Sequence, residues 1–348
     1  MSKKLKQIVL IGTILLLFVF ICVSFYLGRQ GRAEYKDEVE YVIGVSQANM
    51  REAWRLALIQ EIQEEAKKYP NIRIIAKDAT SIVDKQEQDV DKLLQFGIDL
   101  LIISPCDTGK MTEKVKEVYQ NGIPVIVMDR GVEGFEYSLF IGPDNDMIGR
   151  QAGEAVVALF DGRPGTVLKL CGNVSATQNQ ERIRGFDSVV QGYSQITLET
   201  RYMEKELKDT AYDALSAMQE KLQDVDVVFA NSDYVAQGAY EALRDMGLEQ
   251  AIQIVGTDGF TGEDEGVDMV MQGKMAATIS CPTGGREAIQ YAINILEQQS
   301  GVPKQVILRS RTITRENADR YLAALKKETA DTGNLITMGY SQVGQESK

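Results

Sequence analysis

The chain has 348 residues, with 50 Asp or Glu, 38 Lys or Arg and no His, which gives a formal net charge of −12. A protein this acidic repels phosphate backbones, which excludes nucleic acid as the expected partner. The lack of histidine excludes Ser-His and Cys-His catalysis and histidine-ligated metal sites. The length predicts about two domains.

The N-terminus carries the pattern of a membrane anchor. Residues 8–27 form an uncharged run of 20 residues, and Lys3, Lys4 and Lys6 precede it. As a helix this run would span roughly 30 Å, the thickness of a hydrocarbon core, with the lysines in the cytoplasm. A cleaved signal peptide is the alternative, although its apolar region is usually only about 7–15 residues long. We therefore predict a cytoplasmic stub and transmembrane anchor within residues 1–33, and an extracytoplasmic body.

From residue 41 onward, short apolar runs alternate with stretches of helical period. Buried strands that alternate with helices in this way indicate a parallel sheet covered on both faces. The first series comprises expected strands at 41–45, 72–76, 100–103 and 125–128, and expected helices at 52–68, 84–96 and 112–121.

A second series of the same kind follows. Its expected strands are 166–170, 196–203, 225–230, 252–256, 275–280 and 306–308, and its expected helices are 145–160, 178–190, 210–222, 234–246, 285–299 and 315–325. Two such series predict two lobes of one α/β architecture. Helical periodicity fades after residue 325, so we expect a flexible tail at 326–348.

Polar residues gather where the predicted strands end. Ligands of open α/β sheets bind beyond the carboxyl ends of the strands, so these residues predict a site, and a cleft if the two lobes face each other. Carboxylates that accept and guanidinium groups that donate hydrogen bonds suit a ligand with many hydroxyl groups. The candidates are Ser46, Gln47, Asn49, Ser104, Asp107, Asp129 and Arg130 in the first series, and Asn231, Ser232 and Asp258 in the second.

Trp54, the only tryptophan, and Arg55 follow the first predicted strand. An aromatic face packs well on the C–H side of a sugar ring, and Arg55 could bond a hydroxyl or the ring oxygen. Purely structural explanations compete with this one. Trp54 could be a core residue, Asp129 and Arg130 a surface ion pair, and Asp258 part of a Gly-Thr-Asp-Gly turn.

Cysteine spacing predicts no metal or redox motif. Cys106, Cys171 and Cys281 are far apart in the sequence, and no Cys-x-x-Cys pair exists. The spacing leaves a disulfide between Cys106 and Cys281 open. We expect neither a metal nor a cofactor.

These motifs, in their order along the chain, resemble the type I periplasmic sugar-binding proteins of the ribose- and galactose-binding group. Residues 43–47 followed by Trp54 and Arg55 resemble most closely the branch of the galactofuranose-binding proteins. The other matching stretches are 124–130, 142–145, 148–149, Arg182 with Gly185 and Phe186, 254–259 and 273–279. The resemblance covers roughly residues 41–325.

The resemblance implies a fold of two lobes joined by a three-segment hinge. The first lobe would hold 41–142 and 283–304, and the second 143–282 and 305–325. Asp129, Arg130 and Asp258 would bind the ligand centrally, with Trp54 stacking and Arg55 bonding. The chain departs from the family at Ser232, where asparagine is common, and at Gln180, where the ribose branch has arginine. Both remain candidate ligand contacts.

The expected function is that of a membrane-anchored, extracytoplasmic binding protein for a mono- or small oligosaccharide, without catalysis. It would serve an ABC importer or a sensor histidine kinase, and the anchor slightly favours the sensor. An α/β glycosidase that uses the carboxylates of Asp129 and Asp258 is the alternative. The core of a transcription regulator is a remote one, because a hydrophobic run stands where DNA-binding helices would be needed.

Overall fold

The computed structural model describes residues 40–172, 177–203 and 207–330. The predicted anchor and the residues beyond 330 lie outside these ranges. Within them, no helix is both long and apolar enough to span a membrane. The last helix, α11, ends at Ala330, so the predicted tail does not begin at Lys326. The residues Lys326 and Lys327 are good helix formers, which continue the helix past its last apolar turn.

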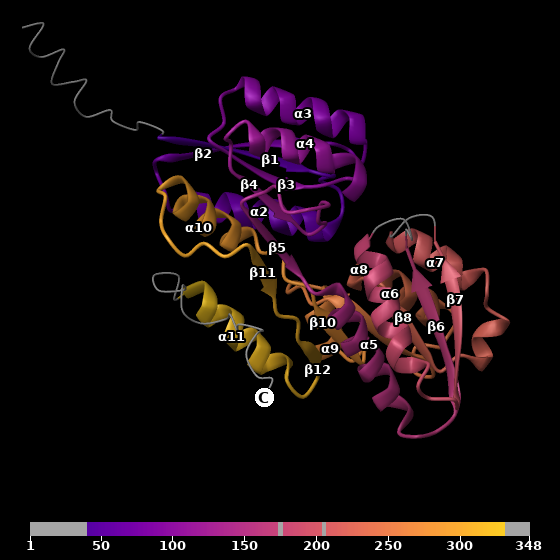
Figure 1. Ribbon diagram of the computed structural model, residues 1–348. Coiled ribbons are helices and arrows are strands. Elements are labelled where there is room, and N and C mark those ends of the chain that lie inside the picture. The colour runs from indigo at the N-terminus through magenta and orange to yellow at the C-terminus, as the bar shows by residue number, and fades with distance from the viewer. Residues whose placement is uncertain (1–39, 173–176, 204–206, 331–348) are drawn as a thin grey trace, which may run out of the picture.

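The first lobe is a parallel sheet with helices on both faces (Figure 1). The strand order is β11-β5-β4-β3-β1-β2. The strands are β1 (Tyr41–Gln47), β2 (Ile72–Asp78), β3 (Leu100–Ser104), β4 (Val125–Met128), β5 (Leu139–Pro143) and β11 (Gln305–Leu308). Helices α2 (Ala53–Ala66) and α10 (Gly285–Leu296) pack on one face, and α3 (Val83–Gln95) and α4 (Thr108–Gln120) on the other.

The second lobe repeats this plan, with strand order β12-β10-β9-β8-β6-β7 and an antiparallel β12 at one edge. Its strands are β6 (Gly165–Cys171), β7 (Ile196–Tyr202), β8 (Val227–Ala230), β9 (Gln253–Asp258), β10 (Ala277–Ser280) and β12 (Thr312–Thr314). Helices α5 (Asn145–Phe160) and α6 (Thr177–Val190) cover one face. Helices α7 (Lys208–Ser216), α8 (Asp233–Asp245) and α9 (Gly266–Met271) cover the other, and a short 3₁₀ helix spans Lys221–Asp224.

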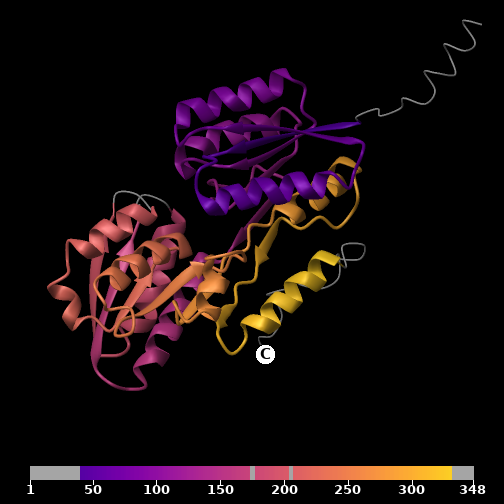
Figure 2. The ribbon, with the colours of Figure 1, turned by 180° about the vertical axis from the view of Figure 1, so that it is seen from behind.

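The chain passes between the two sheets three times, from β5 to α5, from β10 to α10 and from β11 to β12. The predicted boundary at residue 305 is wrong, because β11 pairs with β5 of the first sheet, with Val306 opposite Ile141. Val306 and Leu308 also pack into the core of the first lobe. The third passage therefore follows Leu308. Helix α11 (Ala318–Ala330) then runs alongside β11 and this passage (Figures 1 and 2).

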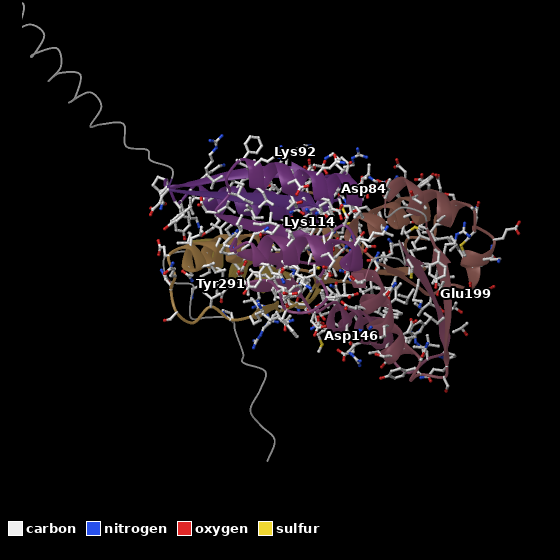
Figure 3. All side chains as sticks on the ribbon, turned by 45° about the horizontal axis from the view of Figure 1, so that its top comes forward. Asp84, Lys92, Lys114, Asp146, Glu199 and Tyr291 are labelled. Atoms are coloured by element: carbon white, nitrogen blue, oxygen red, sulfur yellow. The ribbon has the colours of Figure 1, made fainter. Side chains whose placement is uncertain are left out.

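Strand register brings the polar strand ends to one edge of each sheet. Gln47, at the end of β1, lies opposite both Asp78 and Ser104. In the second sheet Asp258, at the end of β9, lies opposite Ser280. The charged residues Lys92 and Glu199, by contrast, are exposed on the outside of the two lobes (Figure 3).

Helices α5 and α6 approach so closely that glycine is needed on both. A Cβ atom on Gly149 would lie 2.0 Å from the carbonyl oxygen of Arg182, and one on Gly185 would lie 2.0 Å from the carbonyl oxygen of Asp146. Beneath this contact, Phe186 stacks on Phe229 with ring centroids 4.2 Å apart. The glycines therefore fix how deep α6 sits.

Gly149→Ala is expected to lower the free energy of unfolding by about 1–3 kcal/mol, because the added methyl group forces the two helices apart. Urea denaturation measures the loss. Gly109→Ala in α4 is the matched control, because its Cβ would meet only ordinary contacts at 3.7 Å or more. Alanine is the better helix former, so this control should be neutral or slightly stabilising. Equal losses in both variants would contradict the packing explanation.

Candidate ligand-binding site

A pocket lies between the two lobes, at the carboxyl ends of their strands. Residues of both lobes form its wall, together with the residue that follows β10. They are Arg51, Glu52, Ala53, Trp54, Arg55, Asp129, Gln178, Asn179, Arg182, Leu207, Ser232, Tyr234, Asp258 and Cys281.

Arg55 organises the first-lobe side of the pocket. Its side chain is only 1% exposed, and its three nitrogens donate to three different residues. Nη2 lies 3.1 Å from Asp129 Oδ2, Nη1 lies 2.7 Å from Ser104 Oγ, and Nε lies 3.0 Å from Glu52 Oε2. Among the described residues, the other oxygen of Asp129 has no hydrogen-bond partner, so Arg55 holds this carboxylate in place while one acceptor stays free for a ligand.

The two central acidic residues share an unusual backbone conformation. Asp129 follows β4 with a φ of 64°, and Asp258 ends β9 with a φ of 130°. Residues other than glycine avoid positive φ because it strains the backbone, and such strained residues are concentrated at functional sites. In both lobes the backbone thus turns sharply where the strand ends, and both residues line the pocket.

Arg182 organises the second-lobe side. It is 6% exposed, and its guanidinium donates to Asn231 O at 2.7 Å, Thr257 Oγ1 at 2.8 Å and Asn145 Oδ1 at 2.9 Å. It also lies 3.5 Å from Cys281 Sγ. The sequence identified Arg182 only as part of a family motif and missed it as a pocket residue. The available signal was a charged residue on the same helical face as the buried Phe186.

Trp54 bridges the lobes. It packs against the core of each lobe, and its indole N–H donates to the carbonyl oxygen of Cys281 at 2.9 Å. The guanidinium carbon of Arg55 lies 5.9 Å from the centre of its ring. Trp54 therefore combines the two roles that the sequence set against each other, because it is partly a core residue and also lines the pocket.

Arg130 forms a second link across the lobes. Its Nε donates to Gln178 Oε1 of α6 at 3.0 Å, and its Nη1 donates to the carbonyl oxygen of Cys106 at 2.7 Å. Burial, together with the neighbouring positive charge of Arg55, lowers its pKa. Arg130 is a partner of the lining residue Gln178 rather than part of the lining itself.

Several other predicted residues support the wall from behind. Ser46 contacts Gln86, and Asp107 caps α4 by accepting from the N–H of Lys110. Asn49 donates to Glu52 Oε1 at 2.9 Å, Gln47 is buried, and Asn231 donates to Asn179 Oδ1. Ser232 lines the pocket, and its hydroxyl caps α8 by accepting from the N–H of Val235.

Gln180 does not reach the pocket in this structure. It is exposed, whereas Gln178 and Asn179 on the same helix line the wall. In a helix of 3.6 residues per turn, positions 178, 179 and 182 share a face that position 180 does not. Gln180 is therefore not part of the lining described here, and its contact with a ligand stays a prediction.

The cysteines of the described ranges are free thiols, so no disulfide joins Cys106 and Cys281. Burial raises the pKa of Cys106 to about 11 and that of Cys281 to about 12. Both thiols are therefore protonated, and poorly reactive, at neutral pH.

Comparison with known proteins decides the family. Residues 43–301 match the family model of the periplasmic binding protein domain. The chain belongs to this family. This confirms the resemblance that the sequence motifs indicated.

Relatives with assigned ligands match most of the chain. The ribose import binding protein of Bacillus subtilis is 29% identical over 247 residues, which are 70% of this chain and 77% of that protein. The galactofuranose-binding protein of Escherichia coli is 24% identical over 285 residues, 78% of this chain and 86% of that protein.

Among solved structures, the fructose-binding periplasmic domain of a hybrid two-component system is 31% identical, with a TM-score of 0.76. The match covers 84% of this chain and 97% of that one. It confirms the predicted fold of two parallel-sheet α/β lobes flanked by helices.

Proposed function

We propose that this protein captures a mono- or small oligosaccharide between its two lobes. The observation that carries the proposal is the pairing of acceptors and donors on both sides of the pocket. Asp129 and Arg55 stand on one side, and Asp258 and Arg182 on the other. Each sugar hydroxyl both donates and accepts, so neighbouring hydroxyls match such pairs. The named ligands of the relatives, which are ribose, galactofuranose and fructose, are of this class.

We further propose that the binding domain lies outside the cell and is anchored by the helix predicted at residues 8–27. The uncharged length of this segment and the lysines before it support the anchor. The sugar-bound form would serve an ABC importer or a sensor histidine kinase. The similarity to a domain of a hybrid two-component system supports the sensor role.

The function is that of a receptor rather than a glycosidase. Asp129 is held in an ion pair with Arg55 at 3.1 Å, an arrangement that suits a hydrogen-bond acceptor better than a proton donor. Incubation with a panel of glycosides should therefore release no product.

Calorimetry on residues 34–348 tests the proposed binding. Titration with D-ribose, D-fructose, galactofuranosides and a wider set of pentoses and hexoses should show saturable heat for at least one of them. Affinities of such sites are on the order of micromolar, or about −8 kcal/mol. Absence of binding across the whole panel would contradict the proposal.

The emission of Trp54 should change when the sugar binds, because this residue is the only tryptophan and lines the pocket. A fluorescence titration measures the change and should give the same Kd as calorimetry. Trp54→Phe provides the control, because it removes the signal while keeping an aromatic face. Unchanged emission at saturating sugar would place the ligand away from the indole ring.

A further inference from the structure

Asp233, the first residue of α8, joins three elements behind the pocket. Its side chain is buried, and its Oδ2 accepts from the backbone N–H of Gly259 at 2.7 Å. The hydroxyl of Thr278, on β10, lies 2.7 Å from Oδ1 and 3.0 Å from Oδ2. The carboxylate thus connects the start of α8 with β10 and with the turn that follows β9.

Two glycines make room for this carboxylate. A Cβ atom on Gly256 would lie 2.4 Å from Asp233 Oδ1, and one on Gly266 would lie 1.8 Å from Oδ2. The carboxylate therefore lies in space that a Cβ atom at either position would occupy. Its geometry is set by main chain from β9 and α9, as well as by its hydrogen bonds.

The turn that Asp233 holds is the one that carries Asp258. Asp258 has a φ of 130°, and Gly259 after it has a φ of 68°. A non-glycine residue in such a conformation costs on the order of 1–3 kcal/mol, which surrounding contacts must offset. The bond from Gly259 N–H to Asp233 is one of these contacts, and the bond from Cys281 N–H to the carbonyl of Asp258, at 2.8 Å, is another.

We propose that Asp233 is a positioning residue, whose ionised carboxylate holds the turn after β9 in the conformation that presents Asp258 to a sugar in the pocket. The expected effect of Asp233 on sugar affinity rests on the proposed function. The expected effect of Asp233 on the turn after β9 does not depend on it. Asp233 does not line the pocket, so it acts through Asp258 rather than by touching the ligand.

The strength of this hold depends on pH. The pKa of Asp233 is raised to about 7, mainly by burial and to a smaller extent by the negative charge of Glu265, before α9. The hydrogen bonds from Thr278 and Gly259 and the positive charge of Arg182 act in the opposite direction. Protonation turns an acceptor into a donor and replaces charge-assisted hydrogen bonds with neutral ones, which are about half as strong. The turn is therefore held less firmly in acid.

Sugar affinity and stability should respond to pH in opposite directions. The folded-state pKa of Asp233 lies above the ordinary carboxyl value of 3.8. Its contribution to stability is therefore fully present below that value and is lost as the pH rises towards 7. Sugar affinity, which needs the ionised form, rises over the same range. No histidine titrates in this window, because the chain has none.

The test uses the full-length protein in detergent micelles and compares wild type with Asp233→Asn between pH 5.5 and 8. Hydrogen exchange of the peptide that contains Gly259 reports on the turn without any sugar. Its protection factor, which is corrected for the intrinsic exchange rate, should fall about fivefold in wild type from pH 8 to pH 5.5. The Kd for D-ribose or D-fructose should rise by a similar factor. In Asp233→Asn, the protection should be low, the sugar affinity weak, and both independent of pH.

Two further variants separate positioning from a simple loss of stability. The protection factor and the Kd each change with pH around a midpoint. Glu265→Gln removes a neighbouring negative charge, so both midpoints should move to lower pH. Thr278→Val removes a hydrogen bond to the carboxylate, so both midpoints should move to higher pH. Subtracting the Asp233→Asn profile removes the contributions of other buried carboxyls with raised pKa values, such as Glu61, Glu181 and Glu287.

Protection of the Gly259 amide that is independent of pH, or unchanged in Asp233→Asn, would overturn the proposal even if sugar binds normally. Midpoints that stay in place in both Glu265→Gln and Thr278→Val would overturn it as well. If neither sugar binds wild type but protection follows the expected pattern, the positioning of the turn stands and the proposed choice of ligand fails.

Discussion

Asp129→Asn is expected to weaken sugar binding by about 100-fold. The substitution keeps the size of the side chain but removes the negative charge that would accept hydrogen bonds from the ligand. Hydrogen bonds to a charged group contribute about 1.5–3 kcal/mol each, and 100-fold corresponds to about 2.7 kcal/mol. Calorimetry with the sugar that binds most tightly in the panel measures the change.

Asp107→Asn is the matched control. Asp107 is also a predicted site residue at the end of a first-lobe strand, but it caps α4 and does not line the pocket. Asparagine caps helices as well as aspartate does, so this variant should keep both stability and affinity. If the two variants lost affinity equally, or if Asp129→Asn bound normally, the ligand would not lie on Asp129.

Arg55→Met is expected to lower the free energy of unfolding by about 3–5 kcal/mol and to abolish sugar binding. The residue is buried, and its loss leaves the carboxylate of Asp129, which is 7% exposed, without its positive partner. Removing one member of a buried ion pair is costly because the remaining charge stays in a poorly solvated site. Urea denaturation measures the stability, and calorimetry measures the binding.

A surface ion pair provides the comparison for this second variant. Arg150 pairs with Asp146 at 2.7 Å, but its side chain is 45% exposed. Exposed pairs of this kind contribute about 0–1 kcal/mol, so Arg150→Met should change little. A small loss of stability in Arg55→Met, similar to that in Arg150→Met, would show that Asp129 and Glu52 do not depend on Arg55.

Local patterns in the sequence predicted most strands and helices, because each depends mainly on its own apolar residues. Strand β5 was missed, since Leu139–Pro143 ends in Gly-Pro, which is typical of a turn. The strand at 306–308 was predicted, but it was assigned to the wrong lobe. Its partner β5 is far away in the sequence, and nothing in a four-residue strand identifies a distant partner.

The candidate site was predicted where the residue type itself implies a role. Trp54, Arg55, Asp129, Ser232 and Asp258 all line the pocket, although their contact with a ligand remains a prediction. Residues such as Ser46, Asn49 and Asp107 are also polar and lie at or after strand ends, yet their side chains bond neighbouring groups instead. Short polar side chains serve turns and helix caps as readily as ligands, so position alone does not separate these uses.

The bond between the indole of Trp54 and the carbonyl of Cys281 determines where motion between the lobes can be observed. It ties α2 to the chain segment that leaves β10 for the first lobe, so a rotation of the lobes that keeps this bond would displace these two residues little relative to each other. Dye pairs that measure the distance between the lobes should therefore be attached far from this hydrogen bond. Asp84 at the start of α3 and Glu199 on β7 are exposed and belong to different lobes (Figure 3). The distance between a pair of dyes attached there should change when the lobes move relative to each other, whereas the distance between the Trp54 indole and Cys281 should change little.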